Sequence, residues 1–488
     1  MAALAEMGVN PFAYAFERTH TSAEALAEFH EDRPEDGPTV VVAGRLVSYR
    51  GKGKTGFGHL EDVAGRIQIY FRQGDLEDQY ELVKLLDLDD HIGVRGEVFR
   101  TRTGEVSVHA REVTLLAKSL RPLPRGKTQE SDTGETVTYG GLQDPETRYR
   151  QRYADLAVHP DVREVFRVRA RAVAFMRRFL DDRDFLEVET PILQPLYGGA
   201  AARPFVTHHN ALDMSLYLRV ADELYLKRLL VGGFERVYEI GHDFRNEGMD
   251  RTHNPEFTML EFYQAYADYN DLMTTIEEMV SGVVEECCGS TTIEYQGTPI
   301  DFTPPWPRLT FFDAVSAAAG IDVRNASDQD LRNLLARTND APEDLDTMAG
   351  GRLLDEVFKT FLERTLIQPT FVIDYPVFLS PLAKVHRHDD QLVERFELFV
   401  NGKELANAFS ELNDPDDQRR RFEQQDAERA SGDEEAHTYD EDYVRALEYG
   451  MPPAGGLGLG VDRLVMLLTD KASIRDVILF PAMRPEGQ

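Results

Sequence analysis

The sequence predicts an α+β protein with two folded parts: a small N-terminal β-barrel and a larger domain built on an antiparallel sheet flanked by helices. Short β-rich runs with glycine turns crowd residues 39–117, a pattern typical of a barrel. Two longer hairpins follow, one over residues 234–266 and one over residues 396–413. Between them, residues 268–370 are charged and mostly helical, and we find no catalytic grouping there.

The chain is strongly acidic. It has 86 Asp and Glu residues against 54 Lys and Arg residues, which gives a formal charge of −32. Only 10 of the basic residues are lysines. An acidic surface with few lysines indicates a halophilic protein from a salty cytoplasm, where the Debye length falls to about 3 Å at 1 M salt. The alternative is ordinary acidic solubility, and the charge is unusual for a protein that binds a polyanion.

Nothing in the sequence predicts export or a membrane segment. The first residues lack a basic stretch followed by an apolar core, and no run of about 18 apolar residues occurs. Cys287 and Cys288 are adjacent, so they offer neither a disulfide framework nor metal-ligand spacing. We therefore expect a protein of the reducing cytoplasm.

The predicted domain boundaries follow changes in this pattern. Residues 1–36 predict a short helical arm, with Ser22 before its apolar run, and residues 37–120 predict a five-stranded barrel that best matches an OB-fold. Residues 121–145 are a linker whose polar, glycine-rich middle, residues 126–140, predicts a mobile loop. The larger domain, residues 146–488, begins with an arginine-rich helix and a strand that Pro191 ends.

The predicted barrel is a candidate site for single-stranded nucleic acid, because OB-folds stack bases on exposed aromatic side chains. Phe57, on the second strand, is the candidate stacking residue. Gln68 and Glu105 are candidates for reading base edges. The alternative for Phe57 is a place in the barrel core, which is the commoner role of a single Phe in a strand.

The first long hairpin has an unusual density of donors and aromatic rings around its turn. Arg245 carries a planar fork that fits a phosphate or a carboxylate. Glu247 can accept from an adenine amino group, and Phe257 offers a face on which a base can stack. These residues are the parts of a nucleotide clamp, and the alternative is a hairpin held by salt bridges.

Two later stretches favour the nucleotide clamp. In the second hairpin, the Asn401–Gly402 turn allows Glu397 and Glu404 to converge across the two strands. Paired carboxylates beside a phosphate site indicate Mg²⁺, which prefers oxygen ligands. A glycine-rich strand from Gly455 then enters an apolar helix that carries Arg463, which can reach a polyphosphate.

Several of these stretches resemble a known family. The sequences FRNE and HNPEF, the run NAFSELND and the run GLGLGVDR resemble motifs two and three of the class II aminoacyl-tRNA synthetases. The stretches YDEDYVRALEYGMPPAGGLGLGVDR and IRDVILFPAMRP are similar to the lysyl-tRNA synthetase family in particular. The resemblance covers residues 37–488. It implies an OB-fold anticodon-binding domain followed by a class II catalytic domain, a homodimer assembled through the motif around Pro191, and ATP-dependent attachment of lysine to tRNA(Lys) with Mg²⁺.

The resemblance also implies roles for single residues, beginning with catalysis by Arg245 and Arg463. Arg245 would contact the α-phosphate and the lysine carboxylate, and Arg463 the γ-phosphate. Glu397 and Glu404 would hold the metal. The residues around ATP would be Arg245, Glu247, His253, Asn254, Phe257, Glu397 and Arg463. The residues around lysine would be Gly199, Glu223, Arg245, Tyr263, Asn407, Phe409, Glu411 and Gly458. The residues at the anticodon would be Phe57, Gln68 and Glu105.

Within the lysine set, Gly199 and Glu223 correspond to the family's α-ammonium site. Glu411, with Tyr263 as its hydrogen-bond partner, resembles the family's ε-ammonium site, while Asn407 and Phe409 would line the aliphatic stem. An anion is required deep in this pocket because an unpaired ammonium cannot be buried.

The sequence departs from the family pattern at two positions and leaves two alternatives. Thr252 stands where many bacterial relatives have Arg, and Ala454 replaces a common Thr, so triphosphate contacts from the hairpin tip are less certain than those of Arg245 and Arg463. A synthetase for aspartate or asparagine would share the fold, but it would need a cation where Glu411 stands. A synthetase-like binding protein without charging activity is the other alternative, which the intact motif residues argue against.

Overall fold

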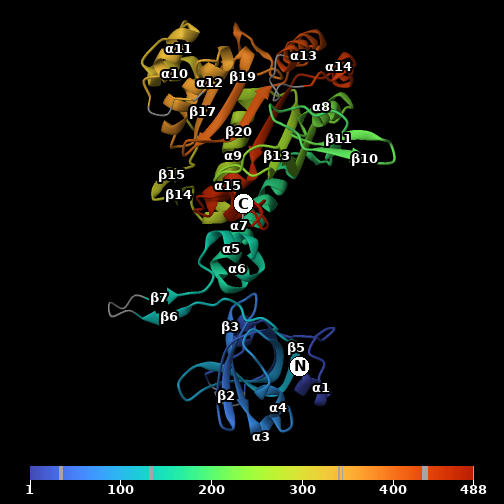
Figure 1. The fold of residues 1–488 in the computed structure, drawn as a ribbon, viewed down its shortest axis with the longest axis vertical. Helices are drawn as coiled ribbons and strands as arrows, with labels where there is room; N and C mark the ends of the chain where they lie inside the picture. The colour runs from blue at the N-terminus through green and yellow to red at the C-terminus, as the bar shows by residue number, and fades with distance from the viewer. Residues whose placement is uncertain (32–36, 131–135, 339–340, 343, 431–437, 487–488) are drawn as a thin grey trace. The chain divides into compact units, whose positions relative to one another are not determined.

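The computed structural model describes residues 1–31, 37–130, 136–338, 341–342, 344–430 and 438–486. The chain divides into two compact units, Met1–Gln143 and Asp144–Gln488. The ribbon of Figure 1 shows the strands of each unit, and each unit is described by itself.

The first unit is built on a closed five-stranded barrel with the strand order β1-β2-β3-β5-β4. Its strands are β1 Thr39–Lys52, β2 Thr55–Glu61, β3 Arg66–Arg72, β4 His91–Arg100 and β5 Val106–Ala117. Alternate residues such as Val40 and Val42 are buried in its core, as period-2 alternation requires. Two short helices, α3 Gln73–Leu76 and α4 Gln79–Lys84, lie between β3 and β4. The predicted OB-fold is confirmed.

The N-terminal segment forms two helices, α1 Ala2–Glu6 and α2 Ser22–Ala27. The second begins at Ser22, but its N-cap is Thr21, which exchanges hydrogen bonds with Glu24 in a capping box. Leu4 and Ala25 are buried in the same core as the barrel strands. The segment is therefore packed into the barrel, and residues 32–36 of the predicted arm lie outside the described residues.

The linker contains a short hairpin where the sequence predicted a loop. Its strands are β6 Lys127–Glu130 and β7 Thr136–Tyr139, which pair in antiparallel register. Residues 131–135, at the centre of the predicted mobile loop, lie outside the described residues. The break between the two compact units falls after this hairpin, between Gln143 and Asp144.

The second unit is organised around a nine-stranded sheet. The order along the sheet is β16 Arg308–Thr310, β17 Thr370–Pro376, β19 Asp389–Val400, β20 Lys403–Ser410, β21 Ala454–Gly460, β13 Glu256–Ala265, β12 Arg236–Phe244 and β8 Leu186–Glu187, and β18 Val385–His386 pairs with β19. All pairs from β17 to β12 are antiparallel, and only the two outermost pairs are parallel. The predicted antiparallel sheet is confirmed.

One face of this sheet packs against three helices, α7 Pro160–Asp181, α9 Tyr269–Cys288 and α15 Val461–Leu468. The strand side chains on this face are apolar, among them Tyr238, Leu260, Phe262, Leu457 and Leu459. Because successive strand residues point to opposite faces, the residues between them point to the other face. That other face carries the polar side chains of the candidate site.

Further helices lie toward the two ends of the sheet along its strand order (Figure 1). Those near β17 are α10 Phe311–Ala319, α11 Asp328–Leu335 and α12 Gly350–Phe361, and those near β12 and β13 are α8 Glu223–Val231, α13 Pro415–Ala430 and α14 Glu441–Glu448. The remaining helices are α5 Pro145–Arg150, α6 Arg152–Val158, α16 Ile474–Val477 and the 3-10 turns η1 Glu363–Thr365 and η2 Val377–Leu379.

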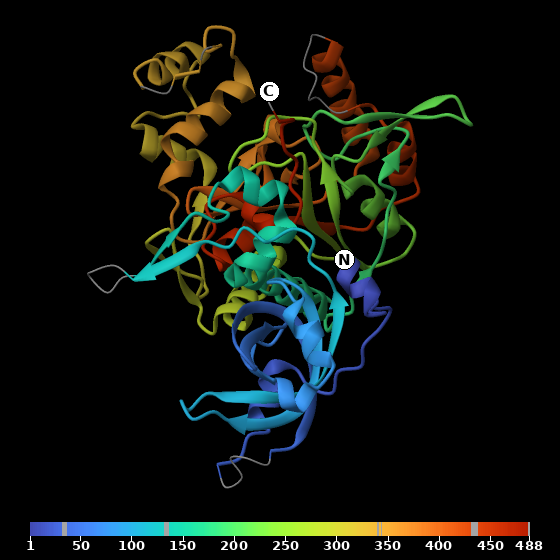
Figure 2. The same ribbon diagram turned by 60° about the horizontal axis from the view of Figure 1, so that its bottom comes forward.

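Two smaller sheets complete the second unit. β9 Leu193–Gln194, β10 Val206–His209 and β11 Met214–Leu218 form one, and β14 Thr292–Tyr295 and β15 Thr298–Asp301 form the other. The β10–β11 hairpin projects away from the large sheet in both ribbon views (Figure 2). Among the described residues, no helix is long and apolar enough to cross a membrane.

Candidate active site

Two rows of residues cross the sheet on its polar face, each residue directly opposite the next. The first row is Glu239, Glu261, Gly458, Asn407 and Glu397. The second row is Val237, Tyr263, Gly456, Phe409 and Arg395. Opposed residues in an antiparallel sheet share a face, so each row is continuous. Both rows have a glycine from β21 at the centre, so no side chain covers the middle of this face at Gly456 and Gly458. We call this strip the glycine floor.

Gly456 is necessary for this floor. A β-carbon built at this position would lie 2.1 Å from Oε1 of Glu411 and 2.3 Å from the ring of Tyr263, far inside van der Waals contact. The same construction at Gly458 meets the terminal carbon of Met259 at 3.2 Å and the side chain of Glu261 at 3.7 Å and beyond. Gly458, the glycine that the sequence analysis selected, therefore lies in the floor, but Gly456 is the one whose hydrogen the pocket requires.

Glu411 lies at the end of this floor, fully buried, with Oε1 making no hydrogen bond. The sequence analysis paired it with the hydroxyl of Tyr263. That pairing is wrong in detail, because the Tyr263 hydroxyl donates to Oε2 of Glu261 at 2.9 Å. The two side chains are neighbours, since both adjoin the β-carbon position of Gly456. Oε1 of Glu411 thus remains a buried acceptor.

Gly199 and Glu223 lie together, as predicted. Gly199 has a φ of +91°, and a β-carbon there would lie 3.2 Å from that of Glu223, so the position favours glycine. Glu223 is buried at the start of α8, and its carboxylate contacts the ammonium of Lys227 one turn later. Lys227 also contacts Glu411. These contacts join the two predicted ammonium sites through one buried cation.

The residues predicted to clamp a nucleotide lie at the other end of β12 and β13. The guanidinium of Arg245 lies over the ring of Phe257, 5.1 Å from its centroid, and the buried Nε makes no hydrogen bond. Asn254 is buried and donates to the backbone oxygen of Glu256 at 2.6 Å, while its Oδ1 makes no hydrogen bond. Glu247 is exposed in the loop between the two strands.

Arg463, Glu404 and His253 are brought together from three separate segments. Nη1 of Arg463 donates to the backbone oxygen of Glu404 at 2.6 Å and lies 3.5 Å from its carboxylate. Nη2 lies 3.3 Å from Nε2 of His253, whose Nδ1 lies 2.8 Å from Asp250. The hydrogen bonds from the His253 side chain and from the Thr252 and His253 amides hold the pKa of Asp250 below its ordinary value, although its burial acts in the opposite direction.

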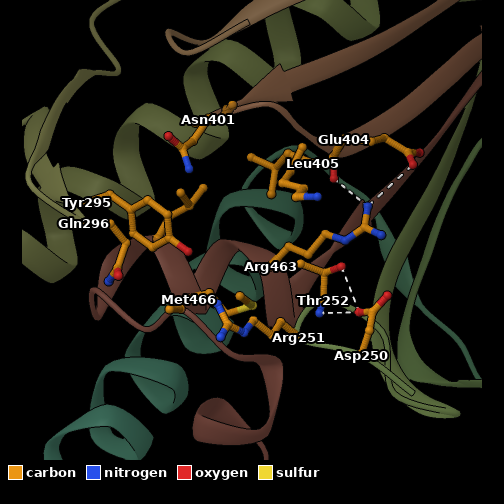
Figure 3. Close-up of a pocket in the computed structure, with 14 residues that line it drawn as sticks. Asp250, Arg251, Thr252, Tyr295, Gln296, Asn401, Glu404, Leu405, Arg463 and Met466 are labelled. Atoms are coloured by element: carbon orange, nitrogen blue, oxygen red, sulfur yellow. Dashed lines mark hydrogen bonds and ion pairs between the residues drawn. The ribbon is translucent and has the colours of Figure 1, made fainter. Parts of the chain in front are cut away.

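A cavity of about 470 Å³ opens beside Arg463 (Figure 3). Its lining includes three basic residues, Arg251, Lys403 and Arg463, two acidic residues, Asp250 and Glu404, and apolar ones such as Leu405 and Met466. Figure 3 shows the side chains of Arg463 and Glu404 joined. The basic residues of the lining can hold an anionic group.

The predicted metal ligands Glu397 and Glu404 both lie on the second hairpin, but they are not directly opposed. Glu397 faces Asn407, and a bulge at Leu398 and Phe399 places Glu404 opposite Phe399. Glu397 accepts from Tyr375 at 2.8 Å and pairs with Arg395. Burial raises its pKa to about 7, the nearby Glu404 carboxylate adds to the rise, and Arg395 opposes it.

The sequence analysis missed an acidic cluster on the same face of the sheet. Oxygen atoms of Asp222, Asp243 and Glu261 all lie within 4.8 Å of one another, and all three residues are buried. Burial raises the pKa of each carboxyl, that of Asp222 to about 6. Arg219 pairs with Asp243 at 3.1 Å and with Glu239 at 2.6 Å. Three buried carboxyls this close together oppose one another's ionisation, and Arg219 offsets part of that repulsion.

The missed residues carried only weak sequence signals. Lys227 follows Glu223 by four residues on a predicted helix, a spacing more often seen on exposed helix surfaces. Arg395 precedes Glu397 by two residues, which places both on one face of a strand. Asp222 and Asp243 had no signal, because only the sheet brings them to Glu261.

The barrel residues are also brought together. Phe57 is 38% exposed, and its ring centroid lies 4.8 Å from that of Tyr70 on β3. Gln68 donates to Glu105 at 2.6 Å, and Nε2 of His59 lies 2.8 Å from the other oxygen of Glu105. An exposed ring beside a fixed amide and carboxylate is the arrangement that stacks and reads a base.

Comparisons with known proteins match both folded parts of the chain. Residues 144–484 match the family described as "tRNA synthetases class II (D, K and N)", and residues 40–116 match the family described as "OB-fold nucleic acid binding domain". The chain therefore belongs to the class II tRNA synthetases.

Full-length relatives narrow this further. A lysine–tRNA ligase from Carboxydothermus hydrogenoformans is 55% identical over 483 residues, which cover 99% of this chain and 96% of the relative. Lysine–tRNA ligases from Moorella thermoacetica and Bacillus subtilis are 54% and 52% identical, each over 99% of this chain, and 96% and 95% of their own lengths are covered. The chain belongs to the lysine–tRNA ligase family.

Proposed function

We propose that this protein activates lysine with ATP and transfers it to the 3′ end of tRNA(Lys). The observation that carries the proposal is the glycine floor on the polar face of the sheet. A buried anion, Glu411, lies at one end of it, and the cationic Arg245 and Arg463 lie on the nucleotide side. A zwitterion with a cationic side chain fits between them.

In the first step, the lysine carboxylate attacks the α-phosphorus of ATP, the bond to the β-phosphate oxygen breaks, and pyrophosphate leaves. In the second, a terminal ribose hydroxyl of the tRNA attacks the lysyl carbonyl, and AMP leaves. The nucleophile of the first step is the substrate itself, so the protein's task is to position the reactants and neutralise charge. Arg245 has a buried Nε without a hydrogen-bond partner, which suits it to the α-phosphate and the lysine carboxylate.

At the nucleotide side, Phe257 stacks on adenine, with Glu247, His253 and Asn254 around the nucleotide. Arg463 binds the γ-phosphate, and its contacts with Glu404 and His253 orient the guanidinium toward the cavity beside it. Planar, bidentate donors of this kind are well matched to phosphate oxygens.

Glu397 and Glu404 fit a Mg²⁺ ion that accompanies ATP. Their donors are carboxylate oxygens, and they are close enough for Glu404 to raise the pKa of Glu397, a repulsion that a cation would relieve. A bound Mg²⁺ would act as a Lewis acid and a template for the phosphates. Tyr375 and Arg395 hold the Glu397 carboxylate in place.

The lysine side chain runs over the glycine floor toward Glu411. Oε1 of Glu411 accepts from the ε-ammonium, Asn407 and Phe409 line the stem, and Tyr263 closes the wall. Gly458 lies in the floor. Gly199 and Glu223 hold the α-ammonium. A buried carboxylate left without a cation is costly, so neutral side chains are rejected.

The barrel binds the anticodon, with Phe57 as the stacking residue and Gln68 and Glu105 at the base edges. Support comes from the exposure of Phe57 and from the hydrogen bond that joins Gln68 to Glu105. We also propose that the protein is cytoplasmic. We further propose a homodimer, because apolar side chains around the Pro191 strand are exposed, among them Leu186, Ile192, Leu193 and Leu196. Light scattering after size exclusion tests the dimer.

The decisive experiment is ATP–pyrophosphate exchange with each of the standard amino acids, at low and at molar KCl. We expect exchange with lysine and with no other amino acid at a comparable rate. Exchange with aspartate or asparagine would keep the fold and overturn the pocket. No exchange at either salt concentration would overturn the activity itself.

A further inference from the structure

Lys227 is the most unusual residue near the proposed lysine pocket. It lies on α8 and is fully buried. Its ammonium contacts Oε1 of Glu223 and Oε2 of Glu411, and it lies 5.0 Å from the ring centroid of Phe409. A lysine side chain of the protein therefore meets the same two carboxylates that the proposed function gives to the two ammonium groups of the substrate.

The titratable groups around Lys227 come from four elements of the second unit and from the residue that follows β20. The groups that face this site are Glu223 on α8, Glu411 after β20, Tyr443 on α14, Tyr263 and Glu261 on β13, and Arg395 on β19. Burial raises the pKa of both tyrosines, which stay neutral, and that of Glu261. The groups in direct contact with the Lys227 ammonium are thus the carboxylates of Glu223 and Glu411.

Each of these charges depends on the others. Burial alone would lower the pKa of Lys227, but Glu223 and Glu411 raise it above its ordinary value, so the ammonium stays charged. Burial raises the pKa of Glu411 to about 8, Glu223 adds to the rise, and Lys227 is the largest influence that opposes it. The contact between Oε2 of Glu411 and the Lys227 ammonium is the observation that favours the ionised carboxylate. Without Lys227, two buried carboxylates would face each other with no cation in contact, and such pairs take up a proton.

The contact also orients Glu411. Its Oε2 faces Lys227, while its Oε1 is buried, makes no hydrogen bond and lies beside the β-carbon position of Gly456, above the glycine floor. Oε1 is therefore the oxygen presented to a ligand on the floor. A protonated carboxyl would be neutral, and with its proton on Oε1 it would present a donor, so it would hold a substrate ammonium more weakly than the carboxylate does.

We propose that Lys227 is a positioning residue that determines specificity: its ammonium keeps Glu223 and Glu411 ionised before substrate arrives and turns the free oxygen of Glu411 toward the substrate side chain. This inference rests on the proposed function. In this inference, Lys227 on α8 keeps the two carboxylates negatively charged, so that the pocket selects a cationic side chain. The substrate ammonium then adds to an existing network of ions and displaces no proton.

The test is Lys227→Met, which keeps the length of the side chain and removes its charge. The lysine KM and kcat are measured by pyrophosphate exchange between pH 6 and 9, where the ε-ammonium of lysine stays protonated, and each value is divided by that of the wild type so that titration of the substrate's α-ammonium cancels. For the variant we expect a lysine KM at least about tenfold higher near pH 7, falling by up to about tenfold per pH unit as the retained proton is lost. The ATP KM of the variant stays within about threefold of the wild-type value. At pH 9 the lysine KM of the variant also comes within about threefold of the wild-type value.

Two controls accompany this variant. Arg228→Met removes a positive charge from the same helix, but its guanidinium pairs with Asp440 at 2.7 Å and contacts neither Glu223 nor Glu411, so the lysine KM should keep the wild-type profile. The second control is norleucine, an amino acid that lacks the ε-ammonium of lysine. The preference for lysine over norleucine should fall in Lys227→Met at low pH and stay unchanged in Arg228→Met.

A measurement on the wild type keeps the inference testable if Lys227→Met does not fold. Calorimetry of lysine binding at pH 7, in buffers of different ionisation enthalpy, counts the protons released. We expect well under one proton, because both carboxylates are already ionised. Release of about one proton, or a variant whose KM and pH profile match those of the wild type, would overturn the role of Lys227. Absence of lysine-dependent exchange in the wild type would instead overturn the proposed function.

Discussion

At the scale of single residues, the selection of a cationic substrate depends on Glu411. We predict that Glu411→Gln raises the lysine KM by about 30-fold to several thousand-fold, because truncating one partner of a buried charge pair costs about 2–5 kcal/mol. The ATP KM should change by less than about threefold. Pyrophosphate exchange over a range of lysine and ATP concentrations measures both constants. Glu423→Gln, an exposed change on α13, is the matched control, and normal lysine activation by Glu411→Gln would refute the pocket assignment.

Gly456 permits a second prediction at this scale, because it tests the shape of the pocket and not its charge. Gly456→Ala should abolish measurable lysine activation or raise the lysine KM by at least about 100-fold, since the added carbon would overlap Glu411 and Tyr263. Gly460→Ala, on the same strand, meets its nearest neighbours at 3.7 Å and should leave the lysine KM within about threefold. Equal effects of the two substitutions on the lysine KM would contradict the shape argument.

At the scale of secondary-structure elements, a buried arginine of α6, held by an ion pair within the same helix, joins α6 to the C-terminal segment. Arg152 and Asp155 are both fully buried and lie 2.8 Å apart, and Arg152 also donates to the backbone oxygens of Arg475 and Leu479. Arg148 and His159 also contact the Asp155 carboxylate, at 2.7 Å and 2.8 Å. Asp155 thereby fixes the arginine that anchors the segment after α15.

We predict that Asp155→Asn costs about 3–5 kcal/mol at neutral pH, because it leaves a buried arginine without its anion. The hydrogen bonds from Arg148, His159 and Arg152 outweigh burial and lower the pKa of Asp155. A lowered pKa contributes stability that is complete above the unfolded value of about 4 and is lost as pH falls through the lower folded value. Thermal unfolding from pH 3 to 8 should show a constant Tm gap above about pH 5 that narrows below pH 4.

The control for this prediction is Asp346→Asn, which alters an exposed turn and should leave the Tm unchanged. A Tm gap that widens in acid would mean that Asp155 is protonated in the folded protein, and the assignment of the ion pair would then be wrong.

The barrel allows a prediction about an element that is separate from the catalytic sheet. Phe57→Ala should lower kcat/KM for tRNA charging by about 5- to 100-fold, since stacking on an aromatic side chain contributes about 1–3 kcal/mol per base. Lysine-dependent pyrophosphate exchange without tRNA should be unchanged. Val63→Ala, at an exposed position after β2, is the control for both assays. An equal loss in charging and exchange would remove the barrel from anticodon reading.

At the scale of the whole molecule, the formal charge of −32 sets the dependence on salt. Repulsion among surface carboxylates destabilises the folded state at low ionic strength, and it also opposes the approach of a tRNA polyanion. We predict that charging activity persists or rises as KCl is increased toward 1 M, where the Debye length is about 3 Å. A series of initial rates in KCl tests this, and an optimum at low salt with loss above a few hundred millimolar would contradict it.

The sequence alone determined the features that depend on neighbouring residues. Period-2 alternation predicted the barrel and the antiparallel hairpins, and the Asn401–Gly402 turn placed Glu397 and Glu404 on adjoining strands. The motif residues Arg245, Phe257 and Arg463 could be named because their local patterns resemble those of a family. All of these signals lie within about twenty residues of chain.

Only the tertiary structure decided which distant residues share a contact. Lys227 meets Glu411, and Tyr263 donates to Glu261 and not to Glu411, because the order β20-β21-β13-β12 and the packing of α8 bring separate segments together. The bulge that places Glu404 opposite Phe399 shifts a register that alternation predicted to be regular. Periodicity records which face a residue occupies, whereas the partner across that face is set by strand order and packing, which no local pattern contains.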